Sequence, residues 1–280
     1  MEDIWKVAAP FVVFPLVALG FMWVLKFLDD QRTSFNEDEQ ILKADNLAVS
    51  LRKSGMYLGL ALGLAGTLFG RSQGLLQDLM NFVIAGLVLI LLLFVAFIVN
   101  DKIILCKIDD DKAVSEGNTA VGLVEFGGYV SSGIIMNGAF SGEGGGILVG
   151  GVFFLLGQAA LIITFYLLEV VTPRNICEEI EVRQNTAEGM DVAGVLIALA
   201  IILRASVAGS FTGWIPGLKG FGLYFVAGLL ALVVFRFLGR IIFVPKASYD
   251  QEIAGDRNLS VATIFAVVQV GLALVIAGTI

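Results

Sequence analysis

Long apolar segments alternate with short polar linkers along the whole chain. Eight of these segments reach roughly 20 residues, the length that spans the hydrocarbon core of a bilayer as a helix. They cover about residues 7–28, 47–70, 79–100, 119–140, 146–169, 187–209, 220–243 and 259–280. We therefore expect an all-α integral membrane protein with eight transmembrane helices.

The alternation has a period that marks four copies of one unit. Asn46, Asn118, Asn185 and Asn258 each open an apolar segment, at spacings of 72, 67 and 73 residues. Each unit is an apolar segment, an acidic linker and an Asn-led segment rich in Gly and Ala. Because a unit contains two spans, all four units have the same orientation in the membrane. The sequence thus predicts four parallel two-helix repeats.

The repeated asparagine has two interpretations. Asn is among the best N-cap residues, since its side chain satisfies backbone N–H groups at a helix start. Four capped helices are the simpler reading. Alternatively, four positive helix N-termini converge at one membrane face and bind an anion or a lipid headgroup.

Small residues recur at fixed distances after each asparagine. Offsets of 2, 9, 13 and 20 residues fall within roughly 40° of one another on a helix. These positions hold Ala48, Gly55, Gly59 and Gly66; Ala120, Gly127, Ser131 and Gly138; Ala187, Gly194, Ala198 and Ala205; and Ser260, Val267, Gly271 and Gly278. Close helix packing in lipid favours such a stripe, and a pore lining is the alternative. We expect the Asn-led helices near a pseudo-fourfold or twofold axis, or two four-helix bundles side by side.

Composition and charge placement fix the expected orientation. Hydrophobic residues make up 58% of the chain and charged residues only 15%, whereas a soluble domain has about 25% charged residues. Most Lys and Arg residues lie in or beside the four linkers, so the linkers are expected in the cytoplasm and both termini outside it.

The start of the chain has Glu2 and Asp3 where a signal peptide would be basic, so the first helix is expected to be retained. The net charge of −7 argues against nucleic acid as a partner.

Charges within the predicted spans are the candidate functional residues. Arg52 and Asp191 lie six residues after their asparagines, and Lys53 and Glu125 lie seven after. We expect Arg52 to pair with Asp191, or Arg52 and Lys53 with Glu125. Such pairs fix helix register or line an ion or proton pathway, unless the long side chains snorkel to the interface.

Other residues limit the chemistry. Arg204 lies toward the outer face, with Asp78 or Glu143 as expected partners.

The chain has no histidine, which excludes His-based catalysis and His metal sites. The acidic linkers lack an EF-hand pattern and are expected to form a solvated face that docks a basic partner or enriches cations. We expect no catalytic, cofactor-binding or metal-binding residues, and no enzymatic activity.

The repeated motif resembles a known family. An acidic linker, Asn-x-Ala and a Gly-rich span occur in Asp45-Asn46-Leu47-Ala48 and in Glu116-Gly117-Asn118-Thr119-Ala120. This pattern is similar to the bacterial inner-membrane family called domain of unknown function 350, or UPF0719. A family domain has about four spans, so the resemblance implies two tandem copies, residues 1–140 and 141–280. It also implies a multi-pass protein of the bacterial inner (plasma) membrane without an established activity.

Two functions are compatible with these features. The first is a channel or transporter for small ions or solutes, favoured by parallel repeats and intramembrane charges. The alternative is a non-transporting membrane scaffold whose acidic linkers recruit a protein. Expected partners are the lipid bilayer, a cytoplasmic protein and a second copy of the chain, with no cofactor.

Overall fold

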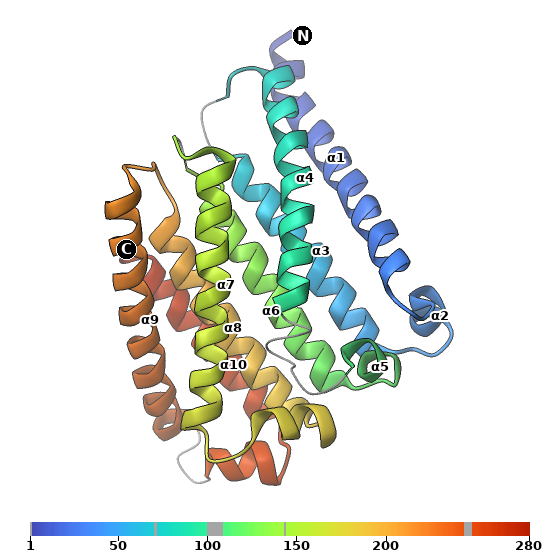
Figure 1. The fold of residues 1–280 in the computed structure, drawn as a ribbon, viewed down its shortest axis with the longest axis vertical. Coiled ribbons are helices and arrows are strands. Elements are labelled where there is room, and N and C mark those ends of the chain that lie inside the picture. The colour runs from blue at the N-terminus through green and yellow to red at the C-terminus, as the bar shows by residue number, and fades with distance from the viewer. Residues whose placement is uncertain (1, 70–71, 100–108, 143, 244–247) are drawn as a thin grey trace.

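The chain folds into helices throughout the part that the structure describes. The structure is a computed structural model, and it describes residues 2–69, 72–99, 109–142, 144–243 and 248–280. Eight long helices lie in these ranges (Figure 1): α1 (Glu2–Arg32), α3 (Leu47–Thr67), α4 (Leu75–Val99), α6 (Thr119–Ala139), α7 (Gly146–Val171), α8 (Thr186–Val207), α9 (Trp214–Phe243) and α10 (Leu259–Ala277).

A short helical turn lies in the linker of each unit. The four linker turns are α2 (Glu37–Leu42), α5 (Asp110–Ser115), η2 (Glu178–Val182) and η3 (Gln251–Gly255). All four lie at the same end of the molecule, which we call the linker end (Figure 1). The connections between α3 and α4, α6 and α7, and α8 and α9 lie at the opposite end.

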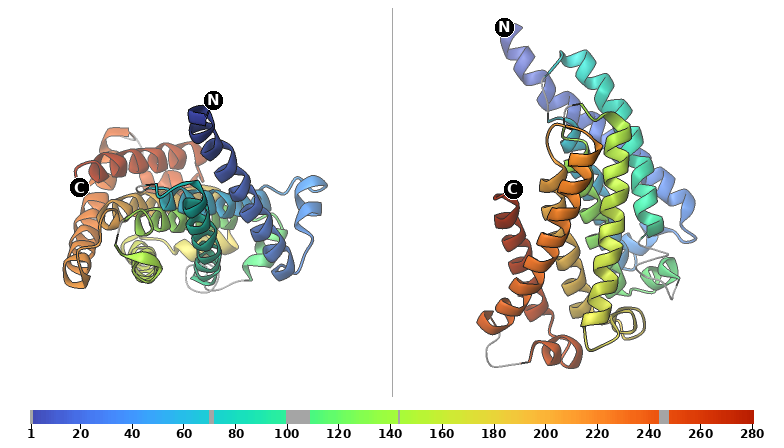
Figure 2. Two further views of the ribbon diagram at one scale, coloured as in Figure 1. Left: turned by 90° about the horizontal axis from the view of Figure 1, so that it is seen from above. Right: turned by 60° about the vertical axis from the view of Figure 1, so that its left-hand side comes forward.

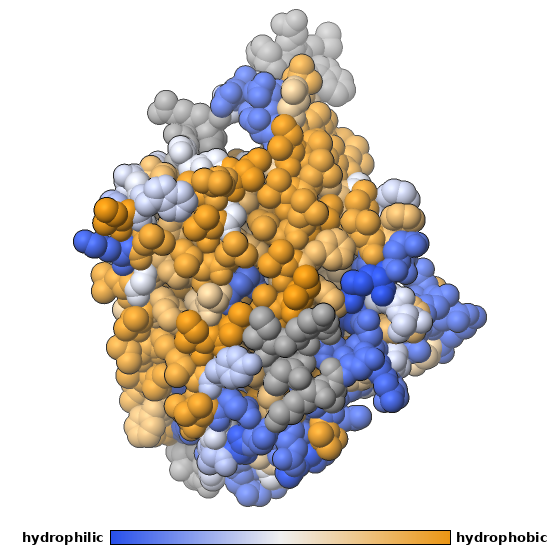
Figure 3. All heavy atoms as spheres, viewed as in Figure 1, coloured by the Kyte–Doolittle hydropathy of each residue, from blue (hydrophilic) through white to orange (hydrophobic). Residues whose placement is uncertain are grey.

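Seven of the long helices are long and apolar enough to cross a membrane within the described residues. The exception is α3, in which Arg52 and Lys53 lower the apolar content. Large apolar side chains such as Phe11, Trp23 and Leu91 are exposed on the outside of the molecule. Figure 3 shows this apolar surface, with hydrophilic residues gathered toward the linker end. The protein is therefore a multi-pass membrane protein whose outer helices contact lipid.

The Asn-led helices form a row. We call α3, α6, α8 and α10 the inner helices and α1, α4, α7 and α9 the outer helices. α3 packs along α6, α6 along α8, and α8 along α10, so the inner helices follow one another across the molecule (Figure 2). α4 fills the groove between α3 and α6, α7 that between α6 and α8, and α9 that between α8 and α10.

This row replaces both arrangements expected from the sequence. In the described part of the chain the inner helices do not close around an axis, and the two halves are not separate bundles, because α6 packs along α8. The reason is that each inner helix has small residues on two faces. One face meets the preceding inner helix and the other meets the following one, which generates a row.

The contact between inner helices is the same in all three pairs. The ninth residue after one asparagine meets the eighth residue after the next. A Cβ added at Gly55 would lie 2.7 Å from Phe126 Cα, and one at Gly127 would lie 2.6 Å from Ala193 Cα. At Gly194 it would lie 2.7 Å from Ala266 Cα. The small residues therefore serve helix packing, and they do not line an opening between these helices.

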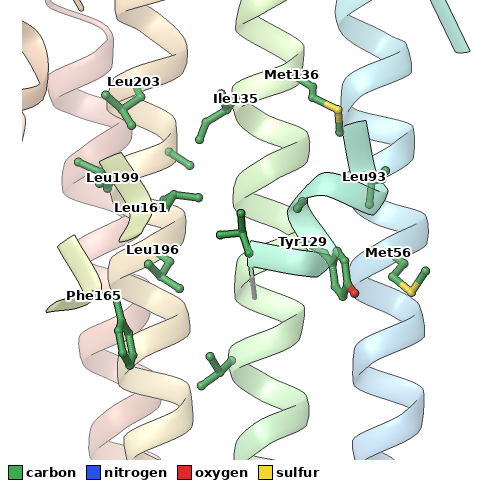
Figure 4. Packing of buried hydrophobic residues seen from close by; sticks show 14 of the residues in the cluster. Met56, Leu93, Tyr129, Ile135, Met136, Leu161, Phe165, Leu196, Leu199 and Leu203 are labelled. Carbon is green, nitrogen blue, oxygen red and sulfur yellow. The ribbon is translucent and has the colours of Figure 1, made fainter. Parts of the chain in front are cut away.

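Between the inner and outer helices lies the apolar core. Figure 4 shows part of it, where Met56, Leu93 and Tyr129 meet between α3, α4 and α6. Farther along the row, Leu161 and Phe165 of α7 belong to the same buried cluster. The core positions the linker-end side chains described next.

Candidate functional site: charged clusters and a polar file at the linker end

Each repeated asparagine caps its own inner helix. Asn46 Oδ1 accepts hydrogen bonds from the backbone N–H groups of Ala48 at 3.0 Å and Val49 at 3.3 Å. Asn118, Asn185 and Asn258 do the same two and three residues on. Only the side-chain oxygen is used for this cap, which leaves the amide nitrogen free to donate elsewhere.

The amide nitrogens join successive units. Asn46 Nδ2 donates to Val114 O at 2.9 Å, and Asn118 Nδ2 donates to Ile180 O at 3.0 Å. Asn185 Nδ2 donates to Ile253 O at 2.9 Å. In each case the acceptor is a backbone carbonyl in the linker turn of the next unit. The sequence interpretation missed this second role because the partner lies more than 60 residues away.

The residue before each asparagine has a positive φ. The angle is 51° at Asp45, 52° at Gln184 and 50° at Arg257, and Gly117 occupies the same position with 88°. This left-handed conformation lets the chain leave the linker turn and enter the inner helix. For residues other than Gly it costs roughly 1–2 kcal/mol, and the asparagine hydrogen bonds hold it in place.

The first charged cluster surrounds Arg52 at the linker end of α3. The Arg52 side chain is fully buried, and its guanidinium lies 3.0 Å from Glu37 Oε1 and 2.7 Å from Asp111 Oδ1. Glu125 Oε1 of α6 lies 3.9 Å away. The alternative expected from the sequence, Arg52 and Lys53 with Glu125, agrees with this placement for Arg52, whereas Lys53 contacts other carboxylates.

Lys53 extends the first cluster toward α1. Its Nζ lies 2.6 Å from Glu37 Oε2 and 3.0 Å from Asp30 Oδ1. Arg32 pairs with Asp29 at 3.1 Å and approaches Asp111 at 3.6 Å. The cluster contains these carboxylates and cations: Asp29, Asp30, Glu37, Asp111 and Glu125 against Arg32, Arg52 and Lys53. Lys26 and Asp38 pair at its rim and add one charge of each sign. Among the described residues of the cluster, carboxylates therefore outnumber cations by two.

A second charged cluster lies at the linker end of α8. Arg236 of α9 binds both carboxylate oxygens of Asp191, with Nη1 2.9 Å from Oδ1. Arg174 lies 2.6 Å from Glu188 Oε2 and 2.6 Å from Asp250 Oδ1. Arg240 approaches Asp250 at 3.6 Å. Here three arginines face three carboxylates.

The predicted Arg52–Asp191 pair is therefore wrong. α6 lies between α3 and α8 in the row, so Arg52 and Asp191 are on helices that are not neighbours. Asp191 instead binds Arg236, 45 residues later in the chain. Arg52 and Asp191 lie at similar distances from the starts of their helices, but this similarity does not show which helices are neighbours.

Arg204 also differs from its predicted environment. Its Nε donates to Asn137 Oδ1 at 2.8 Å, and Asn137 Nδ2 donates to Leu62 O at 2.8 Å. Asp78, one expected partner, accepts from Ser72 and from the Gln73 N–H. Glu143, the other, lies outside the described residues. Arg204 and Asn137 thus link α3, α6 and α8 away from the linker end.

Buried polar side chains follow one face of α6 from the first cluster toward the membrane interior. Glu125, Tyr129 and Ser132 are spaced by four and three residues, which places them on one helix face. Gln158 of α7 donates to Ser132 Oγ at 3.0 Å. We call these four residues the polar file. The Tyr129 hydroxyl is buried, with no hydrogen-bond partner among the described residues.

A pocket lined by both polar and apolar residues lies at the end opposite the linkers. It has a volume of about 590 Å³ and is formed where α3, α6 and α8 end and α4, α7 and α9 begin. Its lining includes Gln73, Asn81, Phe140 and Ser206. Between this pocket and the polar file, the buried Met136 lies one turn beyond Ser132.

The acidic linkers do not form a metal site in the part of the chain that the structure covers. No group of three or more His, Cys, Asp or Glu residues there is arranged to hold a metal ion. The carboxylates of the clusters instead face arginine and lysine side chains.

Comparison with known proteins identifies the family. The sequence model described as Domain of Unknown Function (DUF350) matches twice, over residues 3–140 and 144–280. The chain belongs to the DUF350 family. It is also 25% identical over 256 residues to a UPF0719 transmembrane protein of Aquifex aeolicus, covering 89% of this chain and 92% of that protein. No solved structure matches the chain.

Proposed function

We propose that this DUF350 protein conducts small cations across a bacterial inner membrane. In this proposal all eight long helices cross the bilayer, including α3, which packs along α6. Both termini lie outside the cytoplasm and the linker end lies inside it, as the Lys and Arg distribution favours. No enzymatic activity is proposed.

The polar file is the observation that supports conduction. Glu125, Tyr129 and Ser132 extend for about 10 Å along α6, at 1.5 Å per residue. Buried ionisable and polar side chains inside a membrane protein are costly and typically mark an ion or proton pathway. The unpartnered Tyr129 hydroxyl offers an oxygen to a passing water or cation.

The charge balance of the first cluster favours cations over anions. Counted over the described residues, its carboxylates outnumber its cations, whereas the second cluster is balanced. A surplus of negative charge at a pathway entrance concentrates cations there. We therefore infer that the first cluster forms the cytoplasmic entrance.

An apolar segment closes the pathway in this structure. Ser132 and the pocket-lining Ala139 are seven residues apart, about 10 Å along the helix. Met136 lies between them on the same face of α6 and is fully buried. Movement of the Met136 side chain would connect the polar file to the pocket at the end opposite the linkers.

The test is cation flux in liposomes containing purified protein. Potassium and proton flux are measured for the wild type, for Glu125→Gln and for Glu188→Gln. The second variant is the matched control, because it removes a buried carboxylate charge from the balanced cluster, outside the polar file. We expect Glu125→Gln to change flux at least several-fold and Glu188→Gln to leave it near the wild-type rate.

A second candidate is a membrane scaffold that recruits a cytoplasmic protein. It is favoured by the tight packing of the inner helices and by exposed linker carboxylates such as Asp38 and Glu39. Absence of flux for potassium, protons, chloride and polyamines in the wild type would overturn conduction. A pull-down with the linker end would then be the next experiment.

A further inference from the structure

The two ends of the inner-helix row present the two halves of the contact that joins the units inside the chain. Three pairs of inner helices share the contact between offset 9 of one helix and offset 8 of the next, and the first pair shows the full set of contacts. Offsets 2, 9, 13 and 20 of one helix meet offsets 4, 8, 15 and 19 of the next. In the first pair these contacts are Ala48 with Gly122, Gly55 with Phe126, Gly59 with Gly133 and Gly66 with Asn137.

At one end of the row, α10 has no following helix within the described chain. Its residues at the forward-facing offsets are Ser260, Val267, Gly271 and Gly278, and all four are exposed. A Cβ added at Gly271 would meet no atom within 4 Å. By contrast, a Cβ at Gly59, the equivalent position of α3, would lie 2.5 Å from Tyr129 O.

At the other end, no inner helix precedes α3 within the described residues. Its backward-facing offsets hold only small residues: Ser50, Ser54, Ala61 and Ala65. Ser54 and Ala65 are exposed, and Ser50 and Ala61 are half-buried. The free face of α3 thus has the small side chains that would let another helix approach closely.

The asparagine hydrogen bonds show the same incompleteness. Asn46, Asn118 and Asn185 each donate to a backbone carbonyl of the following linker turn. Asn258 Nδ2 has no such carbonyl acceptor among the described residues. It donates to Glu252 Oε2 of its own unit, at 2.8 Å, a bond that Asn46 and Asn185 also make to the residue six positions earlier. The carbonyl acceptors in the other linker turns belong to residues four or five positions before the next asparagine. The equivalent residues of α2 are Leu42 and Ile41, and Leu42 is 83% exposed.

We propose that α10 of one copy packs against α3 of a second copy and continues the row. The internal contact joins units of the same orientation, so the second copy needs no inversion in the membrane. The expected neighbours are Ser260 with Ser50, Val267 with Ser54, Gly271 with Ala61, and Gly278 with Ala65. Because this interface is head-to-tail, it produces a ring where the rotation closes and an open chain where it does not.

This assembly is independent of the proposed conduction. It follows from the contact between units and requires no transported species. It is compatible with a pathway through α6 and with a scaffold, since the polar file lies on α6 and α7, away from the joined faces of α3 and α10.

Cysteine cross-linking in native membranes tests the proposal. In a background without Cys106 and Cys177, Ser50→Cys and Ser260→Cys are combined in one chain, and each is also made alone. We expect the double variant to form intermolecular disulfides, since helix contacts this close satisfy the Cα separation of about 4.4–6.8 Å that a disulfide needs. Copies with the single changes, expressed together, should form mixed dimers.

The controls separate this interface from others. Ser50→Cys combined with Val233→Cys, on the lipid-exposed surface of α9, should not cross-link. Gly271→Phe should reduce the Ser50–Ser260 cross-link at least about tenfold while the melting temperature in detergent is unchanged. No cross-link in the double variant would overturn the proposal and leave lipid or another protein on these faces. Cross-links in a single variant would overturn it in favour of a two-fold dimer.

Discussion

Asn118 Nδ2 lies 3.0 Å from Ile180 O, a contact that joins the two halves matched by the family model. It has the same geometry as the contact of Asn46 with Val114 inside the first half. The junction between the two family copies is thus built like the junctions within each copy.

The first prediction concerns this amide. Asn118→Ser keeps a good N-cap but removes the donor to Ile180 O and leaves a buried carbonyl unsatisfied. We expect a loss of about 1–3 kcal/mol in the free energy of unfolding, measured by chemical denaturation in detergent. Asn258→Ser is the control and should lose less, because Asn258 has no carbonyl of a following unit to satisfy within the chain.

The second prediction concerns the close approach of α6 and α8. Gly127→Ala places a methyl group 2.6 Å from Ala193 Cα, so the helices must separate. Overpacking of this kind costs typically 1–3 kcal/mol, seen as a lower thermal midpoint. Gly151→Ala, where a Cβ meets nothing within 4 Å, should be neutral or slightly stabilising. Equal effects of the two changes would contradict the packing role of the glycine.

A third prediction distinguishes the two partners considered for Asp191. Removing one member of a buried ion pair costs about 3–5 kcal/mol. We therefore expect strong coupling between Asp191→Asn and Arg236→Met in a double-mutant cycle of stability. The Asp191→Asn and Arg52→Met cycle should be additive, since these residues belong to different clusters.

The fourth prediction concerns the proposed barrier. Met136→Ser adds a polar group between Ser132 and the outer pocket, so the cation flux of reconstituted protein should rise several-fold. Leu199→Ser, a change to a fully buried residue of α8, controls for general loosening of the core. A similar rise in both variants would count against a barrier at Met136.

The fifth prediction concerns pH. Burial raises the pKa of the Glu37 carboxyl above its ordinary value of 4.5, and the Asp29 charge adds to the rise while Lys53 and Arg52 oppose it. A carboxyl whose pKa is higher in the folded state binds its proton more tightly there. Its stabilising contribution is fully present below about pH 4.5 and is lost as the pH rises through the folded value.

Glu37→Gln should remove this contribution. We expect the melting temperature of the variant in detergent to depend less on pH than that of the wild type between about pH 4 and 7. Curves of equal slope for the two proteins would show that Glu37 does not have a raised pKa.

Much of the fold follows from sequence pattern, because its determinants are local. The long helices coincide with the apolar segments, and Asn46 and its equivalents begin the inner helices as N-cap chemistry requires. The small residues after Asn46, Asn118 and Asn185 lie at helix contacts. Each of these features depends on residues within one or two helical turns.

The candidate site was less accessible, because it depends on which helices are neighbours. Arg52 and Asp191 have the same depth, and only the order of helices in the row separates them. The sequence did not single out Arg236 or Arg174. Arg236 of α9 lies 45 residues after Asp191, and Arg174 lies 14 residues before Glu188, in the bend that follows α7. Tyr129 and Gln158 were also missed, and the signal that could have found them is a polar residue inside an otherwise apolar span.

The acceptors of the asparagine amides are backbone carbonyls in three of the four units, and every amino acid supplies such a carbonyl. The linker turns could therefore diverge from EDEQIL to DDKAVS and QEIAG without disturbing the joints between them. A gene that duplicates one unit would need no compensating changes at the new joint. The architecture thus allows chains to lengthen or shorten by whole units while their linker-end surfaces acquire different roles.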